Sequence, residues 1–130
     1  SDTTRTFAVG HVSEQQKEIY ELVREAQETG VRNMGPGIVA SKPDAEIRKV
    51  VKKYEEYYYS GMGHGVGLDL HEEPFLGMYG TKIMQPGCVI TMEPGIYIPG
   101  WGGVRIEDTV LITENGAETL THFPKDLMIL

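Results

Sequence analysis

Four side chains along the chain have the types that a metal centre requires. Three are carboxylates and one is an imidazole: Asp2, His64, Glu93 and Glu107. His64 stands in a run of glycines, GMGHGVG, which leaves open space around its ring. Carboxylate oxygens with one imidazole nitrogen suit divalent ions such as Mn²⁺, Co²⁺, Zn²⁺ or Fe²⁺. Because carboxylates can bridge two ions, and two ions about 3.5–4 Å apart activate a shared hydroxide at neutral pH, the set predicts metal-assisted hydrolysis.

Each of these residues also has a purely structural interpretation. An aspartate beside a strand start, such as Asp2, is typical of a cap or a turn. Glu93 ends the apolar run 89–92, and a buried carboxylate needs a partner of some kind. Arg105 and Glu107 are two residues apart on an extended segment, so an ion pair on one strand face is the alternative for Glu107. The residues alone leave both interpretations open.

Other reactive side chains carry weaker signals. His71 is followed by Glu-Glu-Pro, which is typical of a solvated turn. Cys88 opens an apolar run and is expected to pack as a small hydrophobic residue. The glycine run at 61–67 lacks the lysine of a P-loop and a surrounding βαβ unit, so it does not predict a phosphate site.

The elements that must position these residues are two helices followed by short strands. Ser13 and Gln16 have the spacing of a capping box, which predicts a helix over 13–29 that ends at Gly30. A second helix is expected from Ser41, with apolar residues at 47, 50, 51 and 54. Helices on one face of a largely antiparallel sheet make the expected fold α+β. Strands are predicted at 3–9, 57–60, 89–93, 96–98, 104–106, 109–113 and 118–120.

Length and charge exclude several classes of protein. The 130 residues include 12 Lys and Arg against 19 Asp and Glu, a net charge of −7. That size fits one domain, and the acidic balance predicts no nucleic-acid partner. No apolar stretch is long enough to cross a bilayer and no secretory signal opens the chain, so no membrane partner is expected. The lone Cys88 cannot form an internal disulfide, which favours a reducing compartment, the cytoplasm.

Four longer blocks of sequence cover almost the whole chain. They are SDTTRTF at 1–7, GHGVGLDLHEEP at 63–74, PGCVITMEPG at 86–95 and VRIEDT at 104–109. In this order they resemble the successive metal-site blocks of the Xaa-Pro dipeptidase (prolidase) and aminopeptidase P family. The resemblance implies the pita-bread fold, an α+β domain built around a curved antiparallel sheet with helices on one face.

The resemblance also implies a role for each candidate residue. It makes four residues the ligands of a dinuclear centre: Asp2, His64, Glu93 and Glu107. Asp2 and Glu107 would bridge two divalent ions, Mn²⁺ or Co²⁺ first and Zn²⁺ or Fe²⁺ as alternatives. His71 would contact the substrate near the scissile bond, Arg105 would support the site, and Glu93 would also handle protons for the bridging water. The implied reaction is hydrolysis of an Xaa-Pro peptide bond.

Two features depart from the family pattern. The family centre uses a fifth ligand, an aspartate on the strand before Asp2, and this chain begins after that position. We therefore expect residues 1–130 to be the C-terminal portion of a catalytic domain, inactive alone, with the N-terminal domain and the first half of the catalytic domain outside it. Relatives also commonly have a histidine four positions before His64, where this chain has Ser60.

The expected partner is a small peptide with proline at the second position, and the expected parent protein is a homodimer. Two other enzymes of the same fold stay open: an Xaa-Pro aminopeptidase and a methionine aminopeptidase. The methionine enzymes usually lack an arginine two residues before the ligand that Glu107 resembles. A non-catalytic pita-bread module that binds peptides or proteins is the alternative of another class, although such modules tend to lose ligands.

Overall fold

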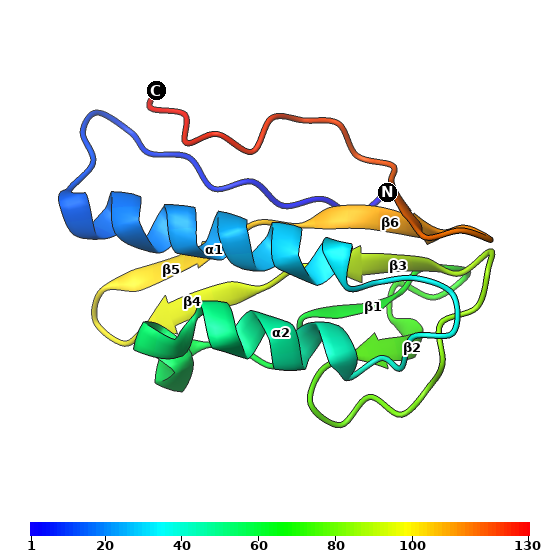
Figure 1. Cartoon of the computed structure of the whole chain (residues 1–130). Coiled ribbons are helices and arrows are strands. Elements are labelled where there is room, and N and C mark those ends of the chain that lie inside the picture. The colour runs from blue at the N-terminus through cyan, green and yellow to red at the C-terminus, as the bar shows by residue number, and fades with distance from the viewer.

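The computed structural model describes residues 1–130 as two helices, a 3-10 helix and seven short strands (Figure 1). The helical part comprises α1 (Glu14–Arg32), α2 (Lys42–Val50) and the 3-10 helix η1 (Lys52–Tyr57). The strands are β1 (Gly63–Gly65), β2 (Glu72–Leu76), β3 (Val89–Met92), β4 (Gly95–Ile98), β5 (Gly102–Arg105), β6 (Asp108–Ile112) and β7 (Ala117–Thr119). The expected α+β class is confirmed. None of the helices combines the length and the apolar content that crossing a membrane requires.

The strands form two antiparallel sheets. The two sheets share one long hairpin, both arms of which are interrupted. The larger sheet has the order β2-β1-β3-β6-β7, and β4 pairs with β5 in the smaller one. The chain passes from β3 into β4 through residues 93–94 and returns from β5 into β6 through residues 106–107. Because β3 pairs with β6 and β4 with β5, these two interruptions lie opposite one another.

At the interruptions the backbone turns to other partners. The Glu93 N–H donates to the Met62 carbonyl oxygen at 2.8 Å, and the Glu107 N–H donates to the Thr4 carbonyl oxygen at 3.0 Å. Each break therefore carries a carboxylate and is held by a segment from outside the hairpin. This arrangement takes two acidic residues out of the regular strand pairing, while their backbone N–H groups stay hydrogen-bonded.

Helix α1 begins as expected and ends later than expected. Ser13 caps it, with the Ser13 hydroxyl accepting from the Gln16 N–H and the Gln16 side chain accepting from the Ser13 N–H. Gly30 does not end the helix, which continues to Arg32. A Cβ at Gly30 would overlap the Met92 sulfur and approach Ile47. The glycine thus permits close approach of the helix to β3 and α2, and the predicted end was wrong for that reason.

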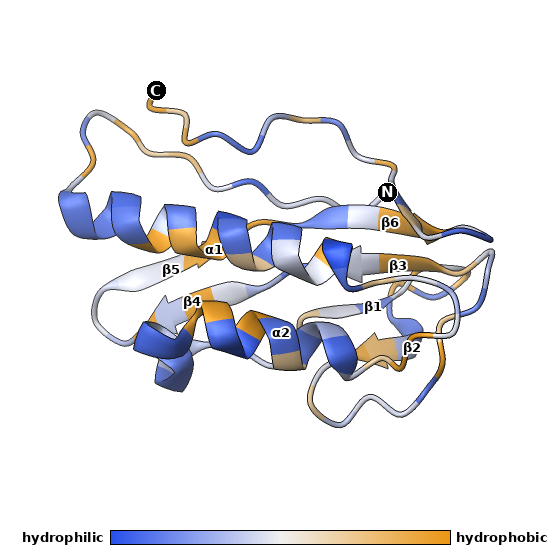
Figure 2. Cartoon of the chain, in the orientation of Figure 1, coloured by the Kyte–Doolittle hydropathy of each residue, from blue (hydrophilic) through white to orange (hydrophobic).

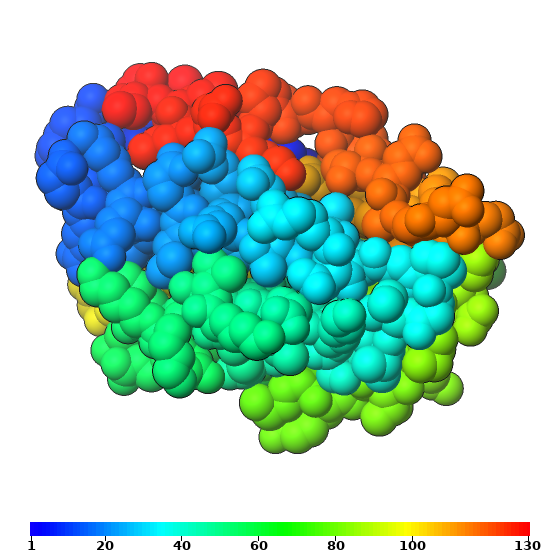
Figure 3. Space-filling view, in the orientation of Figure 1, coloured from blue at the N-terminus to red at the C-terminus, as the bar shows by residue number.

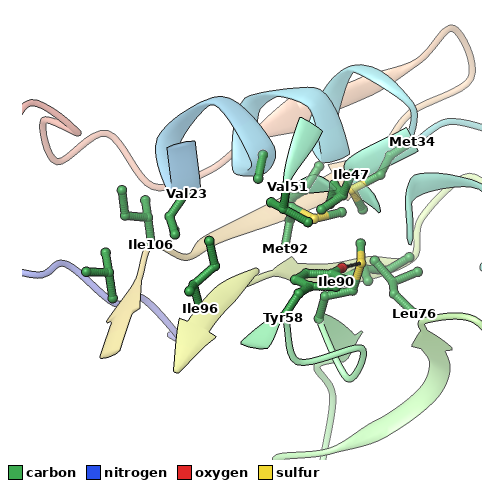
Figure 4. Packing of buried hydrophobic residues seen from close by; sticks show 14 of the residues in the cluster. Val23, Met34, Ile47, Val51, Tyr58, Leu76, Ile90, Met92, Ile96 and Ile106 are labelled. Carbon is green, nitrogen blue, oxygen red and sulfur yellow. Dashed lines mark hydrogen bonds between the residues drawn. The ribbon is translucent and has the colours of Figure 1, made fainter. Parts of the chain in front are cut away.

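The two helices cover one side of the sheets and bury the core between them. Figure 2 shows their apolar residues on the side that faces the strands, and Figure 3 shows α1 and α2 side by side across this face. Residues from both layers interlock in the core, with Ile47 of α2 and Met92 of β3 fully buried (Figure 4). Ile90, Ile96 and Ile106 supply the same side of the strands.

The first segment of the chain is not the strand that was predicted at 3–9. It makes only isolated bridges, Thr4 with Glu107 and Ala8 with Ile129. The Ala8 N–H donates to the Met128 carbonyl oxygen at 3.0 Å, so the N-terminal and C-terminal segments run side by side (Figure 1). Its β-branched residues favour an extended backbone, but the neighbouring segments pair with it at single residues and not along a continuous ladder.

Four of the other predicted strands are confirmed within two residues of their limits, as β3, β4, β5 and β6, and the last one as β7. The strand predicted at 57–60 is wrong, because Tyr57 ends η1 and Tyr58 makes a single bridge to Ile96. The predicted second helix stops at Val50, and the turn that follows it is 3-10. Strands β1 and β2 were not predicted, since glycine and proline interrupt the alternation that marks a strand.

Candidate metal centre

The structure brings all four predicted ligands together from four separate segments. Asp2 lies in the N-terminal segment, His64 is the middle residue of β1, and Glu93 and Glu107 occupy the two opposed interruptions. One ligand atom from each of Asp2, His64 and Glu107 lies within 4.8 Å of the others. The His64 Nε2 atom lies 3.2 Å from Glu93 Oε1 and 3.5 Å from Asp2 Oδ2.

Strand alternation explains why these side chains meet on the side away from the helices. Ile90 and Met92 of β3 point into the core, so Thr91 between them and Glu93 after them point to the other face. Ile106 is fully buried in the same core, which directs Glu107 away from it. β1 is hydrogen-bonded beside β3, and this pairing places His64 next to both carboxylates.

The His64 ring is held in one orientation by its own backbone neighbourhood. Its Nδ1 atom lies 3.0 Å from the Gly65 carbonyl oxygen, which requires a proton on Nδ1 for a hydrogen bond. In that tautomer the Nε2 lone pair faces the oxygens of Glu93 and Asp2. Lone pairs from a nitrogen and two carboxylates repel unless a cation lies between them, so this geometry fits a proton or a metal ion.

Glu107 is buried without a cationic partner. Its exposed fraction is 3%, and its only side-chain hydrogen bond comes from the Thr4 hydroxyl to Oε2. Burial raises the pKa of Glu107 above its ordinary value, the Thr4 hydrogen bond lowers it, and the charges of Glu93 and Asp2 raise it further. Several uncompensated acids at one place form the kind of environment that a divalent cation neutralises.

Arg105 lies near Glu93 and Glu107 but forms an ion pair with neither of them. Its Nη1 atom donates to the Tyr97 hydroxyl at 3.3 Å, and its Nε atom donates to the Thr4 hydroxyl at 3.3 Å. The Tyr97 hydrogen bond is the main cause that raises the pKa of Arg105, with smaller contributions from Glu93 and Glu107. The simple Arg105–Glu107 ion pair considered as the structural interpretation is therefore not formed, which leaves Glu107 free to bind a metal.

Threonine hydroxyls hold the three acids, and sequence analysis missed them. Thr91 donates to Glu93 Oε1 at 3.0 Å, Thr109 donates to the Asp2 carbonyl oxygen at 2.6 Å, and Thr4 donates to Glu107. A signal for two of them was present, because Thr4 and Thr91 stand two residues from Asp2 and Glu93 and so share their faces of extended backbone. Thr91 and Thr4 contact the carboxylates of Glu93 and Glu107 and so can orient them, whereas Thr109 holds the backbone of Asp2.

His71 lies at the entrance to this cluster. Its ring meets the His64 ring edge-on, with centroids 4.3 Å apart. It is solvent-exposed and lies in a bend just before β2, as the predicted turn required. Nearby, an open cleft of about 270 Å³ is lined by Glu93, Arg105, Tyr59 and Tyr97. A small ligand can therefore reach Glu93 from solvent.

The remaining reactive residues lie elsewhere. Cys88 is a free thiol, partly buried against the core as expected. Ser60, which stands where the family resemblance leads one to expect a histidine, is partly buried.

Comparison with known proteins identifies the family. The model of Metallopeptidase family M24 matches residues 1–114. The chain belongs to metallopeptidase family M24. The blocks that carried the resemblance in the sequence all fall within the matched part.

Individual relatives of this M24 chain agree with that assignment. It is 51% identical over 130 residues to the Xaa-Pro dipeptidase of Pyrococcus furiosus, an alignment of 98% of this chain and 37% of the relative. It is 43% identical to the Xaa-Pro dipeptidase of Lactobacillus helveticus, over 100% of this chain and 36% of the relative. The chain thus spans about 37% of the length of the first of these relatives.

Solved structures show the same fold. The prolidase from Pyrococcus horikoshii OT3 superposes with a TM-score of 0.94 at 50% identity, covering 98% of this chain and 38% of that one. The X-Pro aminopeptidase from Thermotoga maritima MSB8 gives a TM-score of 0.95 at 33% identity, over 100% of this chain and 38% of that one. The pita-bread fold that the resemblance implied is therefore confirmed.

Proposed function

We propose that the protein containing this chain hydrolyses the peptide bond before proline in Xaa-Pro dipeptides. The observation that carries the proposal is the cluster of three carboxylates around His64 Nε2, held by four segments of an M24 fold. Two relatives named Xaa-Pro dipeptidase, whose sequences are 51% and 50% identical to this chain, support the choice of substrate. Because the chain spans about 37% of such a relative, the activity is assigned to the longer protein.

In this proposal Asp2, His64, Glu93 and Glu107 would be the ligands that hold two divalent ions, Mn²⁺ or Co²⁺. Oxygen donors with a single imidazole favour such ions over thiolate metals. The part of the protein outside residues 1–130 supplies a further aspartate ligand. Bound ions of this kind polarise a carbonyl group and lower the pKa of a bound water toward neutrality.

The remaining steps use side chains of this chain. Glu93 accepts a proton at its carboxylate, which lines the open cleft. His71, exposed beside His64, donates a hydrogen bond to the oxygen that becomes negative when the carbonyl is attacked. Arg105 adds a fixed positive charge at the rim, where Tyr97 and Thr4 hold its guanidinium in place.

The test uses the full-length protein, stripped of metal and reloaded with Mn²⁺ or Co²⁺. We expect cleavage of Ala-Pro that requires the ion, and loss of that cleavage in the Glu93→Gln variant. A protein that binds metal yet cleaves neither Ala-Pro nor longer Xaa-Pro peptides would contradict the proposal.

Substrate comparison separates the related enzymes. Faster cleavage of Ala-Pro-Ala-Ala than of Ala-Pro indicates an Xaa-Pro aminopeptidase, which the likeness to the Thermotoga structure keeps as the second candidate. Faster cleavage of Met-Ala-Ser than of Ala-Pro indicates a methionine aminopeptidase. Absence of Mn²⁺ binding in calorimetry indicates a binding module.

The free Cys88 and the family's peptidase chemistry are consistent with a cytoplasmic enzyme.

A further inference from the structure

Thr91 connects two candidate ligands through one hydroxyl group. Its Oγ1 atom accepts the His64 backbone N–H at 3.1 Å and donates to Glu93 Oε1 at 3.0 Å. His64 lies on β1 and Glu93 follows β3, so the hydroxyl joins the two strands at the level of the site. The same Glu93 oxygen lies 3.2 Å from His64 Nε2.

Burial makes this contact directional. Thr91 has an exposed fraction of 0%, so its hydroxyl proton has no access to water. A hydroxyl donates one hydrogen bond, and in this position Glu93 Oε1 is the acceptor that the structure provides. The proton therefore fixes the rotation of the Glu93 carboxylate and leaves its second oxygen free.

The backbone around Thr91 is close-packed, which keeps the strands in this register. A Cβ on Gly63 would overlap the Thr91 carbonyl oxygen, so β1 and β3 approach more closely than side chains would permit. The His64 N–H consequently meets a side-chain hydroxyl instead of a backbone carbonyl. The position of the His64 backbone and that of the Glu93 carboxylate thus depend on one side chain.

Resting on the proposed function, we infer that Thr91 is the positioning residue that sets the distance and orientation between His64 and Glu93 for metal binding. It acts through these two residues, because its hydroxyl is engaged by the His64 N–H and by Glu93 Oε1. Outer partners of metal ligands typically change metal affinity about 10–100-fold when they are removed.

The experiment compares two substitutions in the full-length protein. Thr91→Val keeps the shape of the side chain and removes the hydroxyl, whereas Thr91→Ser keeps the hydroxyl and removes a buried methyl group. Thr119→Val on β7 is the matched control, since Thr119 is also a strand threonine and is partly buried, but lies two strands away from Thr91, on the edge of the sheet. Mn²⁺ affinity is measured by calorimetry, the Co²⁺ ligand field by visible absorption, and the unfolding of the metal-free forms by circular dichroism.

A positioning role predicts that metal binding depends on the hydroxyl and not on the packing of the methyl group. Thr91→Val should bind Mn²⁺ about tenfold or more weakly and change the Co²⁺ spectrum. Thr91→Ser should keep both the affinity and the spectrum even though it unfolds more easily than the wild type. Thr119→Val should bind as the wild type does.

The inference would be overturned if Thr91→Val kept the wild-type affinity and spectrum. It would also be overturned if Thr91→Ser lost as much affinity as Thr91→Val, because packing would then matter and the hydroxyl would not. If Thr91→Val does not fold, Thr91→Ser and Thr91→Ala decide: retention in Ser with loss in Ala supports the role, and equal behaviour of the two overturns it. Cleavage of Ala-Pro by the wild type alongside a neutral Thr91→Val leaves the proposed function intact. A wild type that neither binds metal nor cleaves Ala-Pro overturns both.

Discussion

Among the three acids of the centre, Glu107 is the most deeply buried. Its exposed fraction is 3%, against side-chain exposures of 17% for Glu93 and 25% for Asp2. Neighbouring negative charges and burial both act against its ionised form. At the scale of the residue, the three clustered acids are electrostatically unfavourable together, and a bound cation would relieve this.

The Glu107→Gln variant separates these two effects. Without metal, the amide removes a buried charge that Asp2 and Glu93 repel, so the free energy of unfolding should rise relative to the wild type. The same change removes a ligand, and Mn²⁺ affinity should fall by more than the ~10–100-fold loss typical of an outer partner. Denaturant unfolding of the metal-free full-length protein and calorimetry measure the two quantities.

Glu118→Gln is the control, because Glu118 is exposed on β7 away from the site. It should change neither quantity. Lower stability of metal-free Glu107→Gln would show that Glu107 is compensated in a way its contacts do not indicate.

Sequence reasoning found the residues that carry unusual chemistry and missed those that hold them. His64 and Glu93 stand out because an imidazole and an acid lie in a glycine-rich run and at the end of an apolar run, whereas Asp2 was singled out only through the family resemblance. Thr91 is not recognisable by type, since a threonine in a strand is ordinary. The ion pair between Arg105 and Glu107 was wrong as an interpretation. Strand alternation shows which residues share a face, but it does not show which side-chain atoms come into contact.

Among the elements, α1 depends most on one position where it crosses other elements. Gly30 lies in the last turn of α1, and within a helix glycine is less favourable than alanine by roughly 1 kcal/mol on propensity alone. A Cβ added at that position would come closest to side-chain atoms of Met92 and Ile47. Packing between helix and sheet therefore outweighs helix propensity at Gly30.

Gly30→Ala should lower the free energy of unfolding, by about 1–3 kcal/mol, although alanine is the better helix former. Gly116→Ala is a matched control, since a Cβ there meets no atom within 4 Å. Thermal unfolding of both variants in the full-length protein checks the difference. Greater stability of Gly30→Ala would mean that α1 can shift away from β3 without cost.

Element prediction succeeded where local signals agree with tertiary packing. The capping box of Ser13 and Gln16 sets the start of α1 in both sequence and structure. The end of α1, the short β1 and the N-terminal segment depend on contacts with distant residues, which no local pattern encodes. The two interruptions that carry Glu93 and Glu107 were placed correctly at strand ends, yet their position opposite one another follows from strand pairing alone.

For the whole molecule, Asp108 connects the two chain ends to the helical layer. It is fully buried and accepts hydrogen bonds from Arg5 at 2.7 Å, Thr121 at 2.7 Å, Gln27 at 2.9 Å and Lys125 at 3.0 Å. Burial would raise the pKa of Asp108, but the hydrogen bonds from Thr121, Arg5 and Lys125 outweigh it and hold that pKa below its ordinary value. One carboxylate thus holds the first segment, α1 and the last segment together.

Asp108→Asn should destabilise the full-length protein by about 3 kcal/mol or more, because it leaves the buried guanidinium of Arg5 without its anion. Asp126→Asn is the matched control, since Asp126 pairs with Arg24 at 2.8 Å but its side chain is 85% exposed. That exposed pair should contribute less than about 1 kcal/mol. Denaturant unfolding compares the two, and equal effects would contradict the role given to Asp108.

The attachment of the first segment by isolated bridges couples ion concentration to local opening. Residues 1–9 carry Asp2 and are held by the Arg5–Asp108 ion pair and two isolated bridges, without a ladder to the sheet, so they can separate from it as one local unit. An ion that needs Asp2 binds only the closed form, and mass action then raises the opening free energy as its concentration rises. Amide exchange at Ala8 and Glu107, whose N–H groups are hydrogen-bonded across this contact, would slow with added Mn²⁺ while exchange in the middle of α1 would not.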